Sequence, residues 1–155
     1  MRRSVASMLG ENLDPATSVV GIDIKVLAGA VFAEIVEDTQ LADDMRQLAR
    51  NLGVDSHRLH QAVAAAHDGG PQQVLGGDPM ASAALALARA ASHSPARIDA
   101  STIQACRDGE LSAAAIVEII TWLSIMQLLH RLTCFLMVPK RPGSRGLLPS
   151  NASDG

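Results

Sequence analysis

Acidic side chains gather in the first third of the chain, at Glu34, Glu37, Asp38, Asp43 and Asp44. Carboxylates grouped in this way can act as general bases or bind a hard cation. Glu34 and Asp38 are therefore candidate catalytic residues. No Glu-x-x-His pair accompanies them, which removes the usual signature of a di-iron helical bundle. The alternative interpretation is a solvated acidic face that also favours the N-terminus of the next helix.

Three histidines, His57, His60 and His67, follow spacings of three and seven residues, which places them on one face of a helix. His57 and His60 are close enough to bind one metal ion through their imidazole nitrogens, so they are candidate metal ligands. His67 lies about 10 Å further along the helix, too far to share that ion. Because a two-histidine site lacks its other ligands, we favour a solvated polar face and expect no metal or other cofactor.

The most apolar segment of the chain, residues 113–137, contains the ionisable side chains Glu118, His130 and Arg131. Glu118 and His130 are twelve positions apart, about 120° around a helix, so they do not share a face. Each needs a polar partner if it is buried, which favours a structural ion pair or an intersubunit contact over catalysis. Histidine is suited to proton transfer near neutral pH, and His130 is the third catalytic candidate.

Two cysteines, Cys106 and Cys134, fall near the ends of predicted helices. The partial negative charge of a helix C-terminus disfavours a thiolate, and apolar surroundings raise the pKa of a thiol. We therefore expect both cysteines to be small buried packing residues. Two cysteines are also too few for the disulfide framework of a small secreted protein.

A succession of helices must position these residues. Apolar residues make up 48% of the chain and aromatic residues only 2%, with Ala and Leu prominent, which favours helices over strands. Caps at Asp38 or Thr39, at Asp55 or Ser56, at Asp99 and at Ser112 set the predicted boundaries. The expected helices cover about 15–36, 40–52, 57–68, 79–92, 100–108 and 113–137.

The predicted organisation is one compact all-α domain of about six helices over residues 15–139, with a flexible arm at 1–14 and a disordered tail at 140–155. The formal charge of −3 and the shortage of aromatic residues argue against a nucleic-acid partner. No sustained apolar stretch follows Met1-Arg2-Arg3, so we expect no signal peptide and a cytoplasmic location.

The last predicted helix is about 37 Å long and long enough to cross a bilayer. Four polar residues oppose a membrane-spanning role because ionised groups at the bilayer centre are costly: Glu118, Gln127, His130 and Arg131. We expect no membrane partner. The sequence instead predicts a core helix that also forms the contact of a homo-oligomer.

Five stretches of the second half match, in this order, the sequence pattern of a known helical superfamily: Ala81–Ala90, Ile98–Ala100, Arg107–Ser112, Ile116–Ile120 and Leu128–Leu132. Through them the segment Met80–Pro139 resembles the carboxymuconolactone decarboxylase and alkylhydroperoxidase-D-like superfamily. Many relatives have an Asn before the Arg of the last stretch, where this chain has His130. The resemblance implies an all-helical, alkylhydroperoxidase-D-like fold that assembles into dimers, trimers or hexamers.

Active members of that superfamily are thiol peroxidases in which a Cys-x-x-Cys opens a helix and a His follows four residues after the second Cys. Gly53 matches the glycine that ends this helix in relatives. Counting back from it, the two cysteines would fall at about Asp38 and Leu41, and the histidine at about Met45. None of the three is present, and no cysteine precedes Cys106. The resemblance therefore implies the fold without its dithiol chemistry.

The sequence leads to three hypotheses of function. The first is a catalytically degenerate alkylhydroperoxidase-D-like domain that acts as an oligomeric or regulatory helical module, with no thiol peroxidase activity. The second is a small-molecule enzyme of the lactone-decarboxylase or peroxidase-related type, which uses Glu34, Asp38 or His130 for acid/base chemistry on a cyclic or carboxylated substrate. The third is a helical module that binds a different protein through its long last helix.

Overall fold

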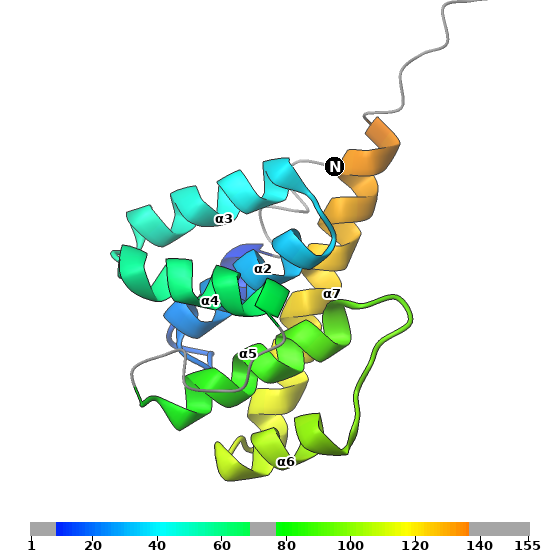
Figure 1. The fold of residues 1–155 in the computed structure, drawn as a ribbon. Coiled ribbons are helices and arrows are strands. Elements are labelled where there is room, and N and C mark those ends of the chain that lie inside the picture. The colour runs from blue at the N-terminus through cyan, green and yellow to red at the C-terminus, as the bar shows by residue number, and fades with distance from the viewer. Residues whose placement is uncertain (1–8, 69–76, 137–155) are drawn as a thin grey trace, which may run out of the picture.

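The computed structural model describes residues 9–68 and 77–136, and every regular element within those ranges is a helix. The prediction of a compact all-α domain is confirmed. A helical turn over residues 9–12 comes first. Six longer helices follow (Figure 1): α2 (Ile22–Ile35), α3 (Thr39–Asn51), α4 (Ser56–Asp68), α5 (Pro79–Ser92), α6 (Ala100–Asp108) and α7 (Ala113–Leu136).

Helix α2 is the centre of the domain and packs against α3, α4, α5 and α7. In Figure 1, α3, α4 and α5 are stacked, and α7 crosses the stack from the end near α6 to the end near α3. Small side chains allow the close packing of α2. A Cβ added at Gly29 would lie 2.8 Å from Sδ of Met45 on α3 and 3.3 Å from Nε1 of Trp122 on α7. A larger residue at position 29 would therefore force the Met45 side chain to move where the three helices meet.

The predicted caps are confirmed by hydrogen bonds. Asp38 accepts the N–H of Leu41 at 3.0 Å, and Asp99 accepts the N–H of Thr102 at 2.8 Å. Oγ of Ser112 accepts the N–H of Ala115 at 3.1 Å, in the first turn of α7. Each cap satisfies an N–H that has no partner inside its own helix. These local signals explain why most predicted helix boundaries agree with the structure.

The first long helix differs from its prediction. It was expected to start at about Pro15, but α2 starts at Ile22. The N–H groups of Val19 and Val20 donate instead to the carboxylate of Glu118 on α7, at 2.8 and 3.0 Å. A contact between residues about a hundred positions apart therefore replaces the helical hydrogen bonds that local propensity favours.

The second half of the segment predicted as a flexible arm lies against the domain, because Leu9 and Leu13 pack on the core. Lys25 on α2 donates a hydrogen bond to the main-chain oxygen of Asn12. The predicted tail at 140–155 lies outside the described residues.

Helix α7 has two different sides. Its inner side is fully buried at Ile119, Trp122 and Met126. Its outer side carries what we call the outer apolar stripe, with side chains from 40% to 78% exposed at Val117, Ile120, Leu128 and Phe135. By length and composition alone, α7 is the one helix among the described residues that could cross a membrane, from Ala113 to Phe135. Its inner side is nevertheless part of the core that α2 and α5 share.

Candidate functional site

Two of the three candidate catalytic residues meet where the start of α3 lies against α7. Oδ2 of Asp38 is 2.8 Å from Nδ1 of His130. Oδ1 of the same carboxylate caps α3 through its hydrogen bond from Leu41. Because both oxygens have partners, the Asp38 side chain is held in a single orientation and is only 7% exposed.

The imidazole of His130 is held on two sides. Asp38 binds Nδ1, and the ring of Phe32 packs edge-on with a centroid distance of 6.4 Å and an interplanar angle of 75°. With the carboxylate ionised, Nδ1–H donates to Oδ2, and in the neutral form of the imidazole Nε2 is then the acceptor. The His130 side chain is 21% exposed, so water or a small molecule can approach it.

The charge state of Asp38 follows from its partners. Burial alone would raise the pKa of this carboxyl group, but the hydrogen bonds from Leu41 and His130 outweigh burial and hold the pKa below its ordinary value of 3.8. Asp38 is therefore ionised at neutral pH. An ionised, fixed carboxylate is the kind of group that orients a histidine for proton transfer.

Cys134 also lies at this site, which the sequence did not predict. It follows His130 by one helical turn, and its Sγ is 3.7 Å from Nε2 and 3.8 Å from Nδ1. These nearly equal distances place the sulfur beside the ring and off the lone-pair direction of Nε2, so the thiol does not donate to Nε2 in this arrangement. Cys134 is exposed, and the expectation of a buried packing residue is wrong for it. The i, i+4 spacing of His130 and Cys134 was the signal that could have placed them together.

Glu34, the third catalytic candidate, belongs to a different cluster. Its Oε1 pairs with Arg46 of α3 at 2.9 Å, and its Oε2 lies 3.6 Å from Nε2 of His67 on α4. Arg46 also pairs with Asp43 at 2.8 Å. The acidic residues predicted as one group are thus divided between this surface cluster and the site at Asp38.

The candidate metal ligands His57 and His60 are both exposed on α4, as a solvated face predicts. Among residues 9–68 and 77–136, no group of three or more His, Cys, Asp or Glu side chains is arranged to hold a metal ion. His67 is directed to Glu34 instead of to the other two histidines.

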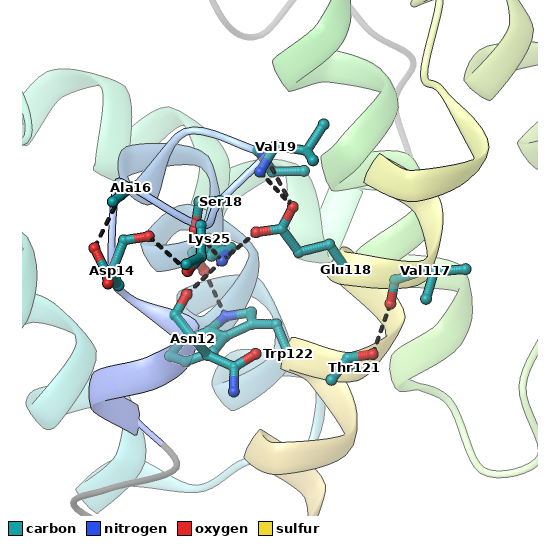
Figure 2. Close-up of polar contacts among 12 residues, drawn as sticks. Asn12, Asp14, Ala16, Ser18, Val19, Lys25, Val117, Glu118, Thr121 and Trp122 are labelled. Atoms are coloured by element: carbon teal, nitrogen blue, oxygen red, sulfur yellow. Dashed lines mark hydrogen bonds and ion pairs between the residues drawn. The ribbon is translucent and has the colours of Figure 1, made fainter.

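A second polar cluster joins α2, α7 and the segment before α2, as Figure 2 shows. Lys25 is 1% exposed, and its ammonium group pairs with Oε1 of Glu118 and with the main-chain oxygen of Asn12. It also donates to Oγ of Ser18 at 2.7 Å. Three donors therefore meet three acceptors. Nε1 of Trp122 donates to the main-chain oxygen of Lys25 at 2.7 Å and closes the cluster from below.

The ionised form of Glu118 is favoured in the same way as that of Asp38. Burial alone would raise the pKa of Glu118, but hydrogen bonds from Lys25, Val20 and Val19 hold it below its ordinary value of 4.5. The expectation that Glu118 and His130 each need a polar partner is confirmed, since Glu118 pairs with Lys25 and His130 with Asp38. Sequence reasoning missed Lys25, although a single lysine in the apolar run of α2 was a signal that it needed a buried anion.

A pocket of about 260 Å³ lies between α5, α6 and α7, away from Asp38 and His130. Most of its lining is aliphatic: Leu87, Ile98, Ile103, Leu111, Ile116 and Ile120. The remaining lining residues are Thr102, Cys106 and Arg107.

The two cysteines do not form a redox pair. Both are free thiols, and burial raises the pKa of Cys106, which lines the pocket beside Ile116. From Ile116 to Cys134 the helix advances 18 residues, or about 27 Å. The expectation of a buried packing cysteine is confirmed for Cys106.

No protein-family model matches the chain, and neither a curated protein nor a solved structure matches it. The resemblance of residues 80–139 to the alkylhydroperoxidase-D-like superfamily therefore stays a prediction. Function has to be inferred from the contacts described above.

Proposed function

We propose that this chain is an alkylhydroperoxidase-D-like helical domain that works as a homo-oligomeric or regulatory module and does not carry out the dithiol peroxidase reaction. The observation that carries the proposal is the outer apolar stripe of α7. Val117 is 64% and Phe135 is 78% exposed, on a helix whose opposite side is the core of the domain. Large apolar side chains aligned on one face favour burial against another surface.

Two residues between the members of the stripe suit close helix packing, whereas Arg131, between Leu128 and Phe135, is long, charged and exposed. Thr121 and Ser124 are small, and their hydroxyl groups donate to the main-chain oxygens of Val117 and Ile120 at 2.8 Å. A second α7 could approach these positions without leaving a buried hydroxyl group unpaired. An isologous contact between two copies of α7 needs no other surface of the domain.

The contacts of Asp38 support the absence of dithiol chemistry. The position at which the resemblance implies the first cysteine holds a carboxylate that caps α3 and binds His130. A hydroperoxide assay with a thiol or lipoyl reductant tests this part of the proposal. We expect no turnover above the protein-free rate. Robust turnover that disappears in Cys106→Ser or Cys134→Ser would overturn it.

Light scattering coupled to gel filtration tests the oligomer. We expect the full chain to be a multimer at micromolar concentration, and Val117→Glu and Leu128→Glu to be monomers with unchanged helical circular dichroism. Gln47→Glu is the matched control, because Gln47 is exposed on α3 and far from the stripe in the fold. A monomeric wild-type protein at all concentrations tested would contradict the proposal, and would favour the third hypothesis if a different protein then bound the stripe.

The Asp38–His130 pair favours an acid/base enzyme as a second candidate function. Asp38 fixes the imidazole through Nδ1, so Nε2 could accept a proton from a small cyclic or carboxylated substrate. A thermal-shift screen of such compounds tests this candidate, with His130→Gln as the variant that should lose any substrate-dependent reaction. A uniformly flat screen would count against it. The cytoplasmic location and the absence of nucleic-acid and membrane partners stay predictions.

A further inference from the structure

The pocket between α5, α6 and α7 has no part in the proposed site or the proposed oligomer, apart from Ile120 at the edge of the stripe. We propose that this pocket binds a medium-chain monocarboxylate, with the hydrocarbon chain in the pocket and the carboxylate at the guanidinium group of Arg107. The inference depends on three properties of the pocket: its lining, its single charge and its size.

The lining favours a hydrocarbon chain over a ring or a polar ligand. Aliphatic side chains from three helices surround the space, and Ile98 and Ile103 are nearly half exposed at its mouth. Thr102 is the one hydroxyl-bearing residue of the lining, and its hydroxyl already donates to Asp99 at 2.9 Å. The Cys106 thiol stays neutral because burial raises its pKa. The interior therefore offers a ligand mostly apolar contacts.

Arg107 supplies the one charge among the lining residues. No carboxylate of the described ranges lies within ion-pair distance of its guanidinium group. The two acidic residues at the ends of α6 are engaged on that helix, since Asp99 caps it and Asp108 accepts a hydrogen bond from Gln104 at 2.7 Å. A guanidinium group beside an apolar pocket complements a carboxylate joined to a hydrocarbon chain.

The size of the pocket limits the length of the chain. Its 260 Å³ equals about nine times the ~30 Å³ that a water molecule occupies in the liquid. The number of heavy atoms in an eight-carbon carboxylate is close to this number of water-sized volumes. Such a ligand would therefore fill the pocket with its carboxylate at the rim. Octanoate is therefore the probe, and octan-1-ol and butanoate are the comparison ligands.

Cys106 reports occupancy, because its thiol lines the pocket. In the full-length Cys134→Ser protein, alkylation of Cys106 by N-ethylmaleimide is followed by mass spectrometry. At ten times its dissociation constant, octanoate leaves about a tenth of the pockets free, so the alkylation rate should fall about tenfold. Butanoate lacks four methylene groups and should bind more than a hundredfold more weakly, at about fourfold for each group.

Two variants separate the charge from the cavity. Arg107→Gln should weaken octanoate about fivefold, the scale of one exposed ion pair, and leave octan-1-ol unchanged. Arg50→Gln, at an exposed arginine of α3, is the matched control and should change neither. Ile103→Trp should fill the mouth of the pocket and weaken both ligands, and circular dichroism checks that each variant is folded.

Four outcomes would overturn the proposal. The first is that octanoate does not slow alkylation. The second is that octan-1-ol binds as tightly as octanoate and Arg107→Gln has no effect. Protection of Cys106 that rises with protein concentration in the absence of octanoate would assign the pocket to a second copy of the chain. Complete protection that is independent of concentration and lost on deletion of residues 137–155 would assign it to the end of this chain. The first two leave the proposed oligomer untouched, because light scattering measures it separately.

Discussion

Helix α7 contributes one member to each of two carboxylate pairs, Glu118 with the Lys25 ammonium group and His130 with the Asp38 carboxylate, and the pairs differ in how completely their hydrogen-bonding groups are used. Near the start of the helix, Glu118 and Lys25 use every donor and both carboxylate oxygens within a cluster that also holds Val19 and Val20. Near its end, Asp38 uses both oxygens, but His130 keeps Nε2 free. A carboxylate therefore uses every donor of its partner at the start of the helix, and leaves one ring nitrogen of its partner unused near the end.

The difference originates in the side chains. An ammonium group has three donors, and a buried lysine must satisfy all of them to offset its lost hydration. An imidazole has two nitrogens with different roles, so a single carboxylate can fix one and leave the other available. Charged residues alone therefore do not identify a candidate site. A better criterion is a side chain that is held in one orientation and still has an unused hydrogen-bond donor or acceptor.

The largest expected effect on stability is at the pair formed by Lys25 and Glu118. Lys25→Ala should lower the free energy of unfolding by about 3–5 kcal/mol, because it leaves Glu118 partly buried without its counter-ion. Urea denaturation followed by circular dichroism measures the change. Lys25→Met combined with Glu118→Gln should recover part of the loss, because neither charge then stays unpaired. A loss below about 1 kcal/mol for Lys25→Ala would show that the cluster is not needed for stability.

A smaller effect on stability is expected at the pair formed by Asp38 and His130. Asp38→Ala should lower the free energy of unfolding by about 2 kcal/mol, with roughly half from the lost cap of α3 and half from the lost hydrogen bond to His130. His130→Gln should remove only the second half. Comparing the two variants by urea denaturation separates the cap from the pair. Equal losses in both would mean that the cap contributes nothing.

The pH dependence should follow from both carboxyl groups. The pKa values of Asp38 and Glu118 are lowered in the folded state, so the folded protein binds fewer protons than the unfolded chain near pH 4. Their contribution is complete above the ordinary values of 3.8 and 4.5 and is lost as the pH falls through the lower, folded-state values. Thermal unfolding between pH 7 and 3 measures this loss. Glu118→Gln with Asp38→Asn should reduce the acid slope and leave the part due to Asp99, whose pKa is lowered to about 2 by hydrogen bonds from Ser101 and Thr102. An unchanged acid slope in the double variant would contradict this expectation.

The smallest effect is expected at Cys134. Cys134→Ser changes an exposed side chain with only a weak contact to His130, so the free energy of unfolding should stay within about 0.5 kcal/mol. Cys106→Ser places a hydroxyl group in a buried apolar position and should be destabilising by about 1–3 kcal/mol. Chemical denaturation of the two variants side by side tests the contrast. A larger loss for Cys134→Ser would mean that its sulfur stabilises the His130 ring.

Sequence reasoning succeeded where the deciding contacts are local. The caps at Asp38, Asp99 and Ser112 lie within three residues of the N–H groups that they bind, so the sequence contains both partners of each hydrogen bond. The all-α class followed from composition and periodicity for the same reason.

It failed where the partner is distant in the chain. The start of α2 depends on Glu118, which binds Val19 and Val20 from about a hundred residues away. The meeting of Asp38 and His130 joins residues 92 positions apart. Both were chosen as candidates from their side-chain types, but periodicity does not reveal which helix faces which.

The contact between Glu118 and the segment before α2 also sets when the domain can be completed during synthesis. Residues 18–25 leave the ribosome long before their carboxylate partner, so the ammonium group of Lys25 stays hydrated while most of the chain is made. It can be enclosed only after α7 begins to emerge. The emergence of α7, more than the formation of any early helix, is therefore the step that allows Lys25 and Glu118 to join these two segments of the domain.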